Sequence, residues 1–414
     1  MKALACILLL GSTSCATYEP PAPVSAFAAG DLAQMEAFCR KQLAEGNENS
    51  FALYLNLLAT TEFLQGNLEA AFRHFRRAGG FMGNWRVSGA EELGAIVGSE
   101  SSKFYRGDPY ERAMNGYYLG LLYWLRGEPD NARAAFKKGL LADTESEGEQ
   151  YQTDFALLSW LAGRASRAMG VPADAEQFFA DARGAQEFAQ AHGSRGRPDA
   201  RVLRQPLHGN VVFLVDVGLG PEKYAGGKDG ELAMFAGRGQ SEQQAEFFIG
   251  GHSLGRSEIL VDLPYQAMTR GGTAMEGIRA GKAVFKDIAT VAGVILVSEG
   301  TKHGNKSSSE VAQLATGVGL LLAALLTSTA ADTRHWSTLP DTVQVLTADL
   351  PPGRHEVRVE FQDGGGRAIA RLTQRWTVEA PEHGESIYYF RSIPGLDGGV
   401  ATASQPGPRT KRNE

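Results

Sequence analysis

Apolar positions between residues 30 and 192 recur with the period of helices that meet at glycine turns. Three segments share one template, in which a turn glycine is followed by a small residue and then, four residues later, by phenylalanine. The template positions are Gly66, Ala71 and Phe75; Gly127, Ala132 and Phe136; and Gly170, Ala175 and Phe179. The small residue lets two helices approach, and the phenylalanine fills the groove between them. The pattern predicts helical pairs across residues 30–192.

An aromatic and charged cluster lies in the longer of the two insertions between these copies. It is made up of Phe104, Tyr105, Arg106, Tyr110 and Glu111. Insertions in helical arrays often form loops on the binding face, and tyrosine and arginine are common interface anchors. These five residues are therefore the candidate partner-binding site. The alternative is that the aromatic rings simply cover the exposed edge of a helix pair.

The period changes after the polar stretch 193–206, which is expected to be a linker. Residues 210–217 form a β-branched apolar run, and residues 355–361 alternate apolar and charged side chains, which is the pattern of a half-buried strand. Further strands are expected at 343–350, 368–378 and 386–391. The chain is thus predicted to be α+β, with a small antiparallel β-sandwich-like domain over 207–395 and a disordered tail over 396–414.

Residues 311–331 carry no charge over a length that could cross a bilayer. Several threonines, serines and glycines interrupt the run, and Glu310 and Asp332 bracket it. We expect an apolar helical hairpin at about 286–331, buried between the helical half and the β-domain. The alternative is a hairpin that inserts into a membrane.

The N-terminus has the layout of an export signal: Lys2, a short apolar run, and small residues leading to Cys15. It resembles a bacterial lipoprotein signal, which implies a signal over 1–15, lipidation of Cys15, and a linker over 16–29. Ser12 departs from the leucine usual in that family. Ordinary cleavage, for example after Ala28, and an uncleaved anchor are the alternatives. The expected location is the cell envelope, at the outer membrane and facing the periplasm.

Composition narrows the choice of function further. The net charge of -6 over 414 residues provides no basic footprint for nucleic acid. Cys39 is the only cysteine outside the signal region, so no internal disulfide is expected, and we interpret Cys39 as a core residue. The histidines show no metal-ligand spacing and the glycines no phosphate loop, so we predict no metal and no cofactor.

The stretch from Gly251 to Gly255 fits the G-x-S-x-G elbow of serine hydrolases, with Ser253 as the nucleophile. That elbow requires a helix after the serine and several parallel strands before it. Here an extended segment follows and one clear strand precedes. We interpret Ser253 as a turn residue between two strands, although Asp341 and His355 do follow it in the order that a triad requires.

The three glycine-turn segments resemble tetratricopeptide repeats. The combination of residues 105–124, 210–223 and 331–357 resembles a group of repeat-bearing bacterial lipoproteins, and the likeness covers most of the chain. Its most specific part is the cluster of Arg334, Trp336, Leu339 and Pro340. The resemblance implies architecture and location but no chemistry. We expect a non-enzymatic scaffold that binds another envelope protein and is attached to the membrane by its N-terminal lipid. The alternatives are a serine hydrolase and a carrier of acyl chains.

Overall fold

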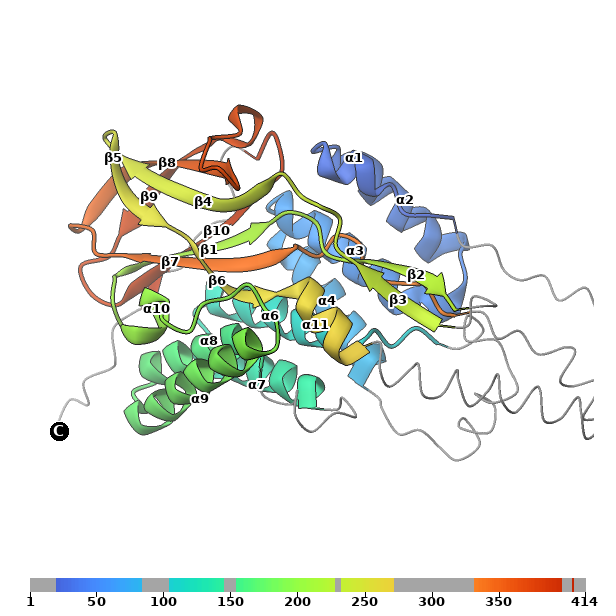
Figure 1. Ribbon diagram of the computed structural model, residues 1–414, viewed down its shortest axis with the longest axis horizontal. Helices are drawn as coiled ribbons and strands as arrows, with labels where there is room; N and C mark the ends of the chain where they lie inside the picture. The colour runs from blue at the N-terminus through green and yellow to red at the C-terminus, as the bar shows by residue number, and fades with distance from the viewer. Residues whose placement is uncertain are drawn as a thin grey trace, which may run out of the picture.

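The computed structural model describes residues 20–83, 104–144, 154–227, 232–271, 331–396 and 404–405. Helices occupy the N-terminal part and strands the C-terminal part, and the two parts pack side by side (Figure 1). This arrangement confirms the α+β class with the helices first. Within the described ranges, no helix combines the length and the apolar character needed to cross a membrane.

The helical region begins with α1 (Val24–Ala28), α2 (Leu32–Glu45) and the 3-10 turn η1 (Glu48–Ser50). Three helix–turn–helix pairs follow: α3 (Phe51–Leu64) with α4 (Leu68–Gly83), α6 (Pro109–Leu125) with α7 (Pro129–Thr144), and α8 (Ala156–Ala168) with α9 (Pro172–Ala191). The short helix α10 (Arg201–Arg204) ends the region.

The glycine template has a direct structural basis. Gly66, Gly127 and Gly170 lie at the three turns with φ of +78°, +74° and +75°, a conformation that L side chains rarely adopt. The Phe136 ring lies against Gly120 of the preceding helix, and the Phe179 ring lies against Gly163 in the same way, leaving no space for a β-carbon at either glycine. The predicted pairing of the helices is therefore present.

The strands form two larger sheets and one ribbon. The five-stranded sheet has the order β11-β10-β1-β7-β6, the four-stranded sheet has the order β5-β4-β8-β9, and the ribbon is β2-β3. Their bounds are β1 Val211–Val217, β2 Glu222–Gly226, β3 Leu232–Ala236, β4 Glu242–Ile249, β5 His252–Arg256, β6 Glu258–Asp262, β7 Thr342–Ala348, β8 Gly353–Asp363, β9 Gln374–Ala380, β10 Glu385–Arg391 and β11 Ser404–Gln405. Short helical turns α11 (Leu263–Gln266), η4 (Ala267–Gly271) and η5 (Ala370–Leu372) complete the described part.

The prediction of a wholly antiparallel domain is wrong at one strand pair. β1 runs parallel to β10, with Val211 opposite Ser386 and Asp216 opposite Arg391, whereas β1 is antiparallel to β7. A parallel pair requires a crossover connection, and here the whole four-stranded sheet lies between the two strands in sequence. The alternation of apolar residues cannot reveal this, because it specifies the face of a strand and not its neighbour.

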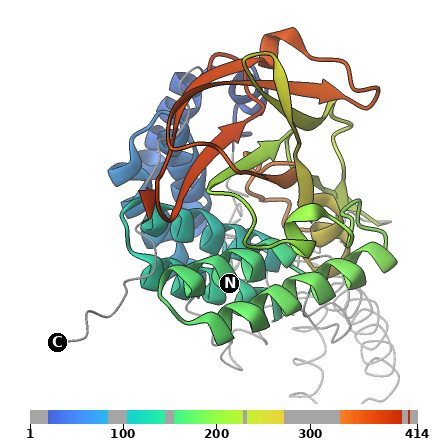
Figure 2. The ribbon, with the colours of Figure 1, turned by 90° about the vertical axis from the view of Figure 1, so that its left-hand side faces the viewer.

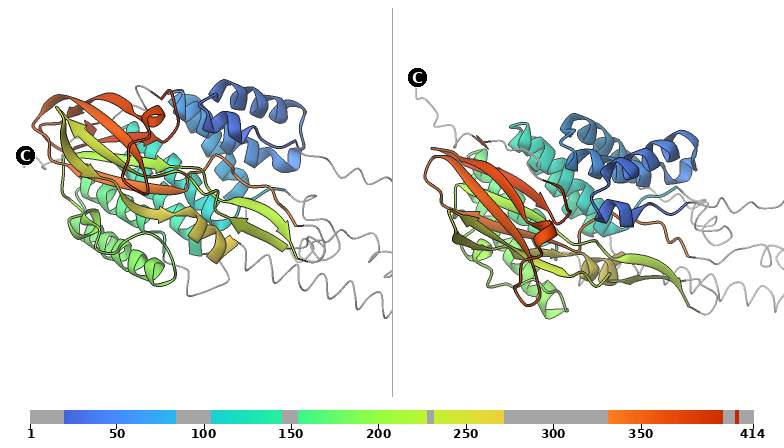
Figure 3. Two further views of the ribbon diagram at one scale, coloured as in Figure 1. Left: turned by 45° about the horizontal axis from the view of Figure 1, so that its top comes forward. Right: turned by 90° about the horizontal axis from the view of Figure 1, so that it is seen from above.

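Two apolar cores explain why β1 carries apolar side chains on both faces. Val211, Phe213 and Val215 belong to the core between the two larger sheets. Val212 and Leu214 belong to the core between the five-stranded sheet and the helices. The molecule therefore has three layers, in which helices, the five-stranded sheet and the four-stranded sheet follow in order (Figures 2 and 3).

The segments predicted as linkers and tail are partly packed. Phe27, in the predicted first linker, lies in helix α1 and is fully buried. In the predicted second linker, Val202 is buried and its carbonyl accepts a 2.9 Å hydrogen bond from Trp160. Ser404 and Gln405, in the predicted disordered tail, pair with β10 as strand β11. The predicted apolar hairpin at 286–331 lies outside the described residues except for Ala331, which is buried.

Candidate functional site

Burial divides the five residues of the predicted partner-binding cluster. Phe104 is 66% exposed and Arg106 is partly exposed. Tyr105, Tyr110 and Glu111 are buried, so atoms of this chain cover their side chains. The sequence left two interpretations open, binding of a partner and packing against a helix pair. Each of them applies to different members of the cluster. Phe104 and Arg106 lie at the surface, and the other three lie beneath it.

A pocket of about 460 Å³ opens at the surface where Phe104 and Arg106 lie. It is formed by three elements far apart in sequence: η1 with the first turn of α3, the last turns of α4, and the segment 104–106. The lining residues are Glu48, Asn49, Phe51, Ala52, Arg77, Phe81, Phe104, Tyr105 and Arg106. The sequence patterns did not single out Phe51, Arg77 or Phe81. Helical spacing alone would have placed Phe81 on the face of α4 that includes Arg77, four residues before it.

Arg77 is held by aromatic rings inside this pocket. Its guanidinium carbon lies 4.8 Å from the centre of the Phe51 ring and 5.9 Å from the centre of the Phe81 ring. The two rings meet edge to face at 5.8 Å. Phe81 is 47% exposed and Phe104 is 66% exposed, so two large apolar rings lie at the surface in the same pocket. The pocket thus combines apolar rings with the guanidinium of Arg77, and the charged residues Arg106 and Glu48 also line it.

The segment 104–106 is attached to the pocket wall through its backbone. The Tyr105 amide donates a 2.6 Å hydrogen bond to the carbonyl of Asn49 in η1. Arg334 donates to the same carbonyl and, at 3.1 Å, to the hydroxyl of Ser50. Arg334 is itself paired with Asp332 at 2.7 Å. Contacts between the helical region and the segment that precedes β7 therefore hold this wall together.

A buried charged cluster lies directly beneath the pocket. Glu111 and the backbone amide of Asp108 form a capping box at the start of α6, and the other carboxylate oxygen of Glu111 accepts from the Trp336 amide. Lys223 of β2 pairs with Asp108 at 2.7 Å, and both side chains are almost fully buried. Burial, with a smaller contribution from the neighbouring Asp108, raises the pKa of Glu111 to about 7.

A second buried network joins the helices to the five-stranded sheet. Asp216 of β1 accepts hydrogen bonds from Tyr118 at 2.6 Å and from Tyr389 at 2.7 Å. It also pairs with Arg391 at 3.3 Å, and both side chains are fully buried. Burial raises the pKa of Asp216 and of both tyrosines. Since solvent does not reach these groups, they cannot take up a substrate in this conformation.

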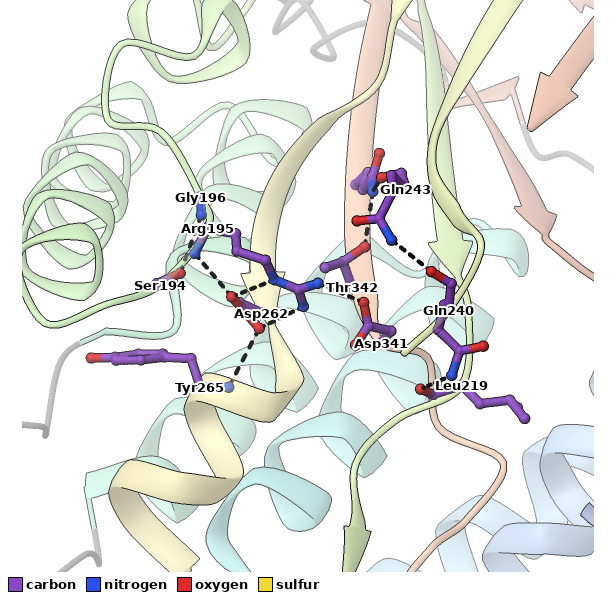
Figure 4. A network of polar contacts seen from close by, with 12 residues as sticks. Ser194, Arg195, Gly196, Leu219, Gln240, Gln243, Asp262, Tyr265, Asp341 and Thr342 are labelled. Atoms are coloured by element: carbon purple, nitrogen blue, oxygen red, sulfur yellow. Dashed lines mark hydrogen bonds and ion pairs between the residues drawn. The ribbon is translucent and has the colours of Figure 1, made fainter. Parts of the chain in front are cut away.

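A third polar cluster joins the end of the helical region to the strands (Figure 4). The guanidinium of Arg195 binds both oxygens of Asp262, at 2.7 and 2.8 Å, and one oxygen of Asp341 at 2.8 Å. Asp262 ends β6 and caps α11, and Asp341 precedes β7. Burial raises the pKa of Asp341 although Arg195 opposes the shift. Arg195 occupies the space between the two carboxylates, which makes the cluster a cross-link between elements.

The elbow sequence lies in a β-hairpin. Ser253 is in β5, just after the turn at Gly250 and Gly251, so it is a strand residue and not a turn residue as we expected. Its hydroxyl donates a 2.7 Å hydrogen bond to Glu246 of β4. His355 lies in β8, and its ring contacts the carbonyl of Pro351. Asp341 pairs with Arg195, so the structure does not bring these three residues together as a triad.

The described residues include one free cysteine, Cys39. Cys39 is fully buried, and burial raises the pKa of its thiol to about 12. In the part of the chain that the structure describes, no group of three or more histidine, cysteine, aspartate or glutamate side chains is arranged to hold a metal ion. In comparisons with known proteins, no protein-family model matches the chain, and no curated protein matches it.

Proposed function

We propose that this protein is a non-enzymatic lipoprotein of the cell envelope that binds another envelope protein. The observation that carries the proposal is the surface pocket, which the exposed rings of Phe81 and Phe104 line together with Arg77. Aromatic and arginine side chains are the usual anchors of protein interfaces. We further infer that the three helical pairs are tetratricopeptide-like repeats, on the basis of their glycine turns and of the small-residue contacts at Gly120 and Gly163.

The packing of the helices limits where a partner can bind. Helices α3, α6 and α8 are buried along most of their length because they lie against the five-stranded sheet and the other helices. The free surface of the array therefore belongs to α4, α7 and α9 and to the pocket at one end of α4. A partner that approached the inner face of the array would have to displace the chain's own sheet.

Lipidation of Cys15 would place this surface close to a membrane. Only the short stretch from Cys15 to Pro20 separates the proposed lipid from the first described residue, and an extended chain of that length spans at most about 17 Å. The fold would then stay near the bilayer surface, where an envelope partner is accessible.

Co-purification from envelopes tests the scaffold proposal. The tagged full-length chain is compared with the double variant Phe81→Ala/Phe104→Ala and with the control Leu207→Ala, which removes an exposed side chain outside the pocket. We expect one stoichiometric envelope protein with the wild type and the control, and its loss with the double variant at unchanged melting temperature. Recovery of no protein, or its retention by the double variant, would count against the proposal.

A further inference from the structure

Among the described residues, cations that stack on aromatic rings are, with one exception, also paired with an acidic side chain. Arg126 lies over Phe72 and pairs with Glu69, and Lys223 lies over Phe235 and pairs with Asp108. The same holds for Arg164 with Glu385, Arg334 with Asp332, Arg358 with Glu360, and Arg391 with Asp216. Arg77 stacks on two rings but, among the described residues, pairs with no carboxylate.

Because Arg77 lacks a carboxylate partner among the described residues, its accessibility decides whether it can bind one from another molecule. Its side chain is exposed and lines the open pocket, so an outside group can reach it. The pocket volume of about 460 Å³ is within the range of pockets that bind ligands, and it accommodates one or two large side chains. A guanidinium fixed between rings loses little conformational freedom on binding, and it binds a carboxylate through parallel hydrogen bonds.

We propose that the pocket recognises a peptide segment of the partner that carries a carboxylate beside a large apolar side chain. The carboxylate pairs with Arg77, and the apolar side chain packs between Phe81 and Phe104. Glu48, which also lines the pocket, disfavours a second acidic group on its side. This inference rests on the proposed scaffold function and specifies the chemistry of its partner.

Fluorescence anisotropy with the full-length chain tests the proposal. Three labelled peptides are compared: Gly-Ser-Glu-Phe-Gly-Ser, the same peptide with lysine in place of glutamate, and the same peptide with alanine in place of phenylalanine. We expect the first to bind at least tenfold more tightly than the other two. Arg77→Glu should weaken it at least tenfold and make the lysine peptide the better ligand. Arg76→Glu is the matched control, since Arg76 is exposed on the same helix but does not line the pocket.

Three results would overturn the inference. The first is equal binding of the acidic and lysine peptides. The second is an equal effect of the Arg76 and Arg77 variants, which would indicate long-range electrostatics. The third is Arg77-dependent binding of dodecanoate that displaces the acidic peptide, which would indicate a lipid pocket. If the envelope partner co-purifies equally with wild type and Arg77→Glu, the peptide chemistry is wrong while the scaffold function stands. If no partner co-purifies but the acidic peptide binds as expected, the scaffold function alone fails.

Discussion

The hydroxyl of Tyr118 in helix α6 donates a 2.6 Å hydrogen bond to the carboxylate of Asp216 in strand β1. The two residues are distant in sequence, and both are fully buried. Because Tyr389 and Arg391 of β10 bind the same carboxylate, this contact ties one helix and two strands to a single charge. The helical and β parts are thus joined by a buried polar network as well as by apolar packing.

Replacement of Asp216 by asparagine should destabilise the whole fold. The amide can still accept hydrogen bonds from the tyrosines, but the charge of Arg391 is left buried without compensation, at a cost of about 3 to 5 kcal/mol. Denaturant unfolding measures the change. Asp199→Asn is the control, since Asp199 is exposed and pairs with the exposed Arg197, and it should stay within about 0.5 kcal/mol of wild type. Equal effects of the two variants would show that Asp216 has no special role.

Phe136 and Phe104 should behave in opposite ways when truncated. Phe136 is fully buried against Gly120, and its replacement by alanine should cost about 3 to 5 kcal/mol of unfolding free energy. Phe104 is largely exposed, so Phe104→Ala should leave the melting temperature near that of wild type while partner binding weakens. A Phe104→Ala variant that melts early would mean that the ring supports the fold and that its binding role is wrong.

Glu111 should make the protein less stable as the pH rises towards neutrality. Its folded pKa of about 7 is above its ordinary value of 4.5, so the folded state binds the proton more tightly than the unfolded state. The stabilisation is complete below the unfolded pKa and is lost as the pH rises to about 7, with a total of about 3 kcal/mol. Unfolding free energies of wild type and Glu111→Gln should be compared from pH 5 to pH 8.

The Glu111→Gln variant cannot titrate at this position, so its pH profile isolates the contribution of Glu111. We expect the advantage of wild type over the variant to shrink as the pH rises across this window. Two parallel profiles would show that Glu111 does not exchange a proton there. A constant offset is expected in addition, because the glutamine amide group cannot accept from both the Asp108 and the Trp336 backbone amides.

Ser253→Ala should leave the function of the protein in cells unchanged. The Ser253 hydroxyl donates to Glu246 in a hairpin, and within the described part of the chain no histidine hydrogen-bonds to it. A serine-reactive fluorophosphonate should therefore fail to label the wild-type chain. Labelling of wild type but not of Ser253→Ala would establish a reactive serine and revive the hydrolase alternative.

Cys15→Ser tests attachment to the membrane. If Cys15 carries the lipid, the variant should appear as a soluble protein or as an unprocessed precursor, because the acyl chains supply the membrane affinity. Fractionation of cells followed by immunoblotting separates these forms. A variant of normal mature size that still pellets with membranes would contradict lipoprotein status.

Sequence patterns alone were enough to find the three helical pairs and some of the strands of this protein. The turn glycines Gly66, Gly127 and Gly170 and the phenylalanine that follows each of them mark the helical pairs, since both act within two adjacent helices. Strand β1 was also recognisable, because burial on both faces requires a continuous apolar run. These patterns can be recognised in the sequence because each depends on residues that are near one another along the chain.

Contacts between distant segments were decided only by the tertiary structure. The parallel pairing of β1 with β10, the ligands of Asp216 and the pocket around Arg77 each join residues from separate elements. For the predicted cluster from Phe104 to Glu111, the sequence could not tell the exposed members from the buried ones. Burial depends on what the rest of the chain places above a residue, and neither composition nor period carries that information.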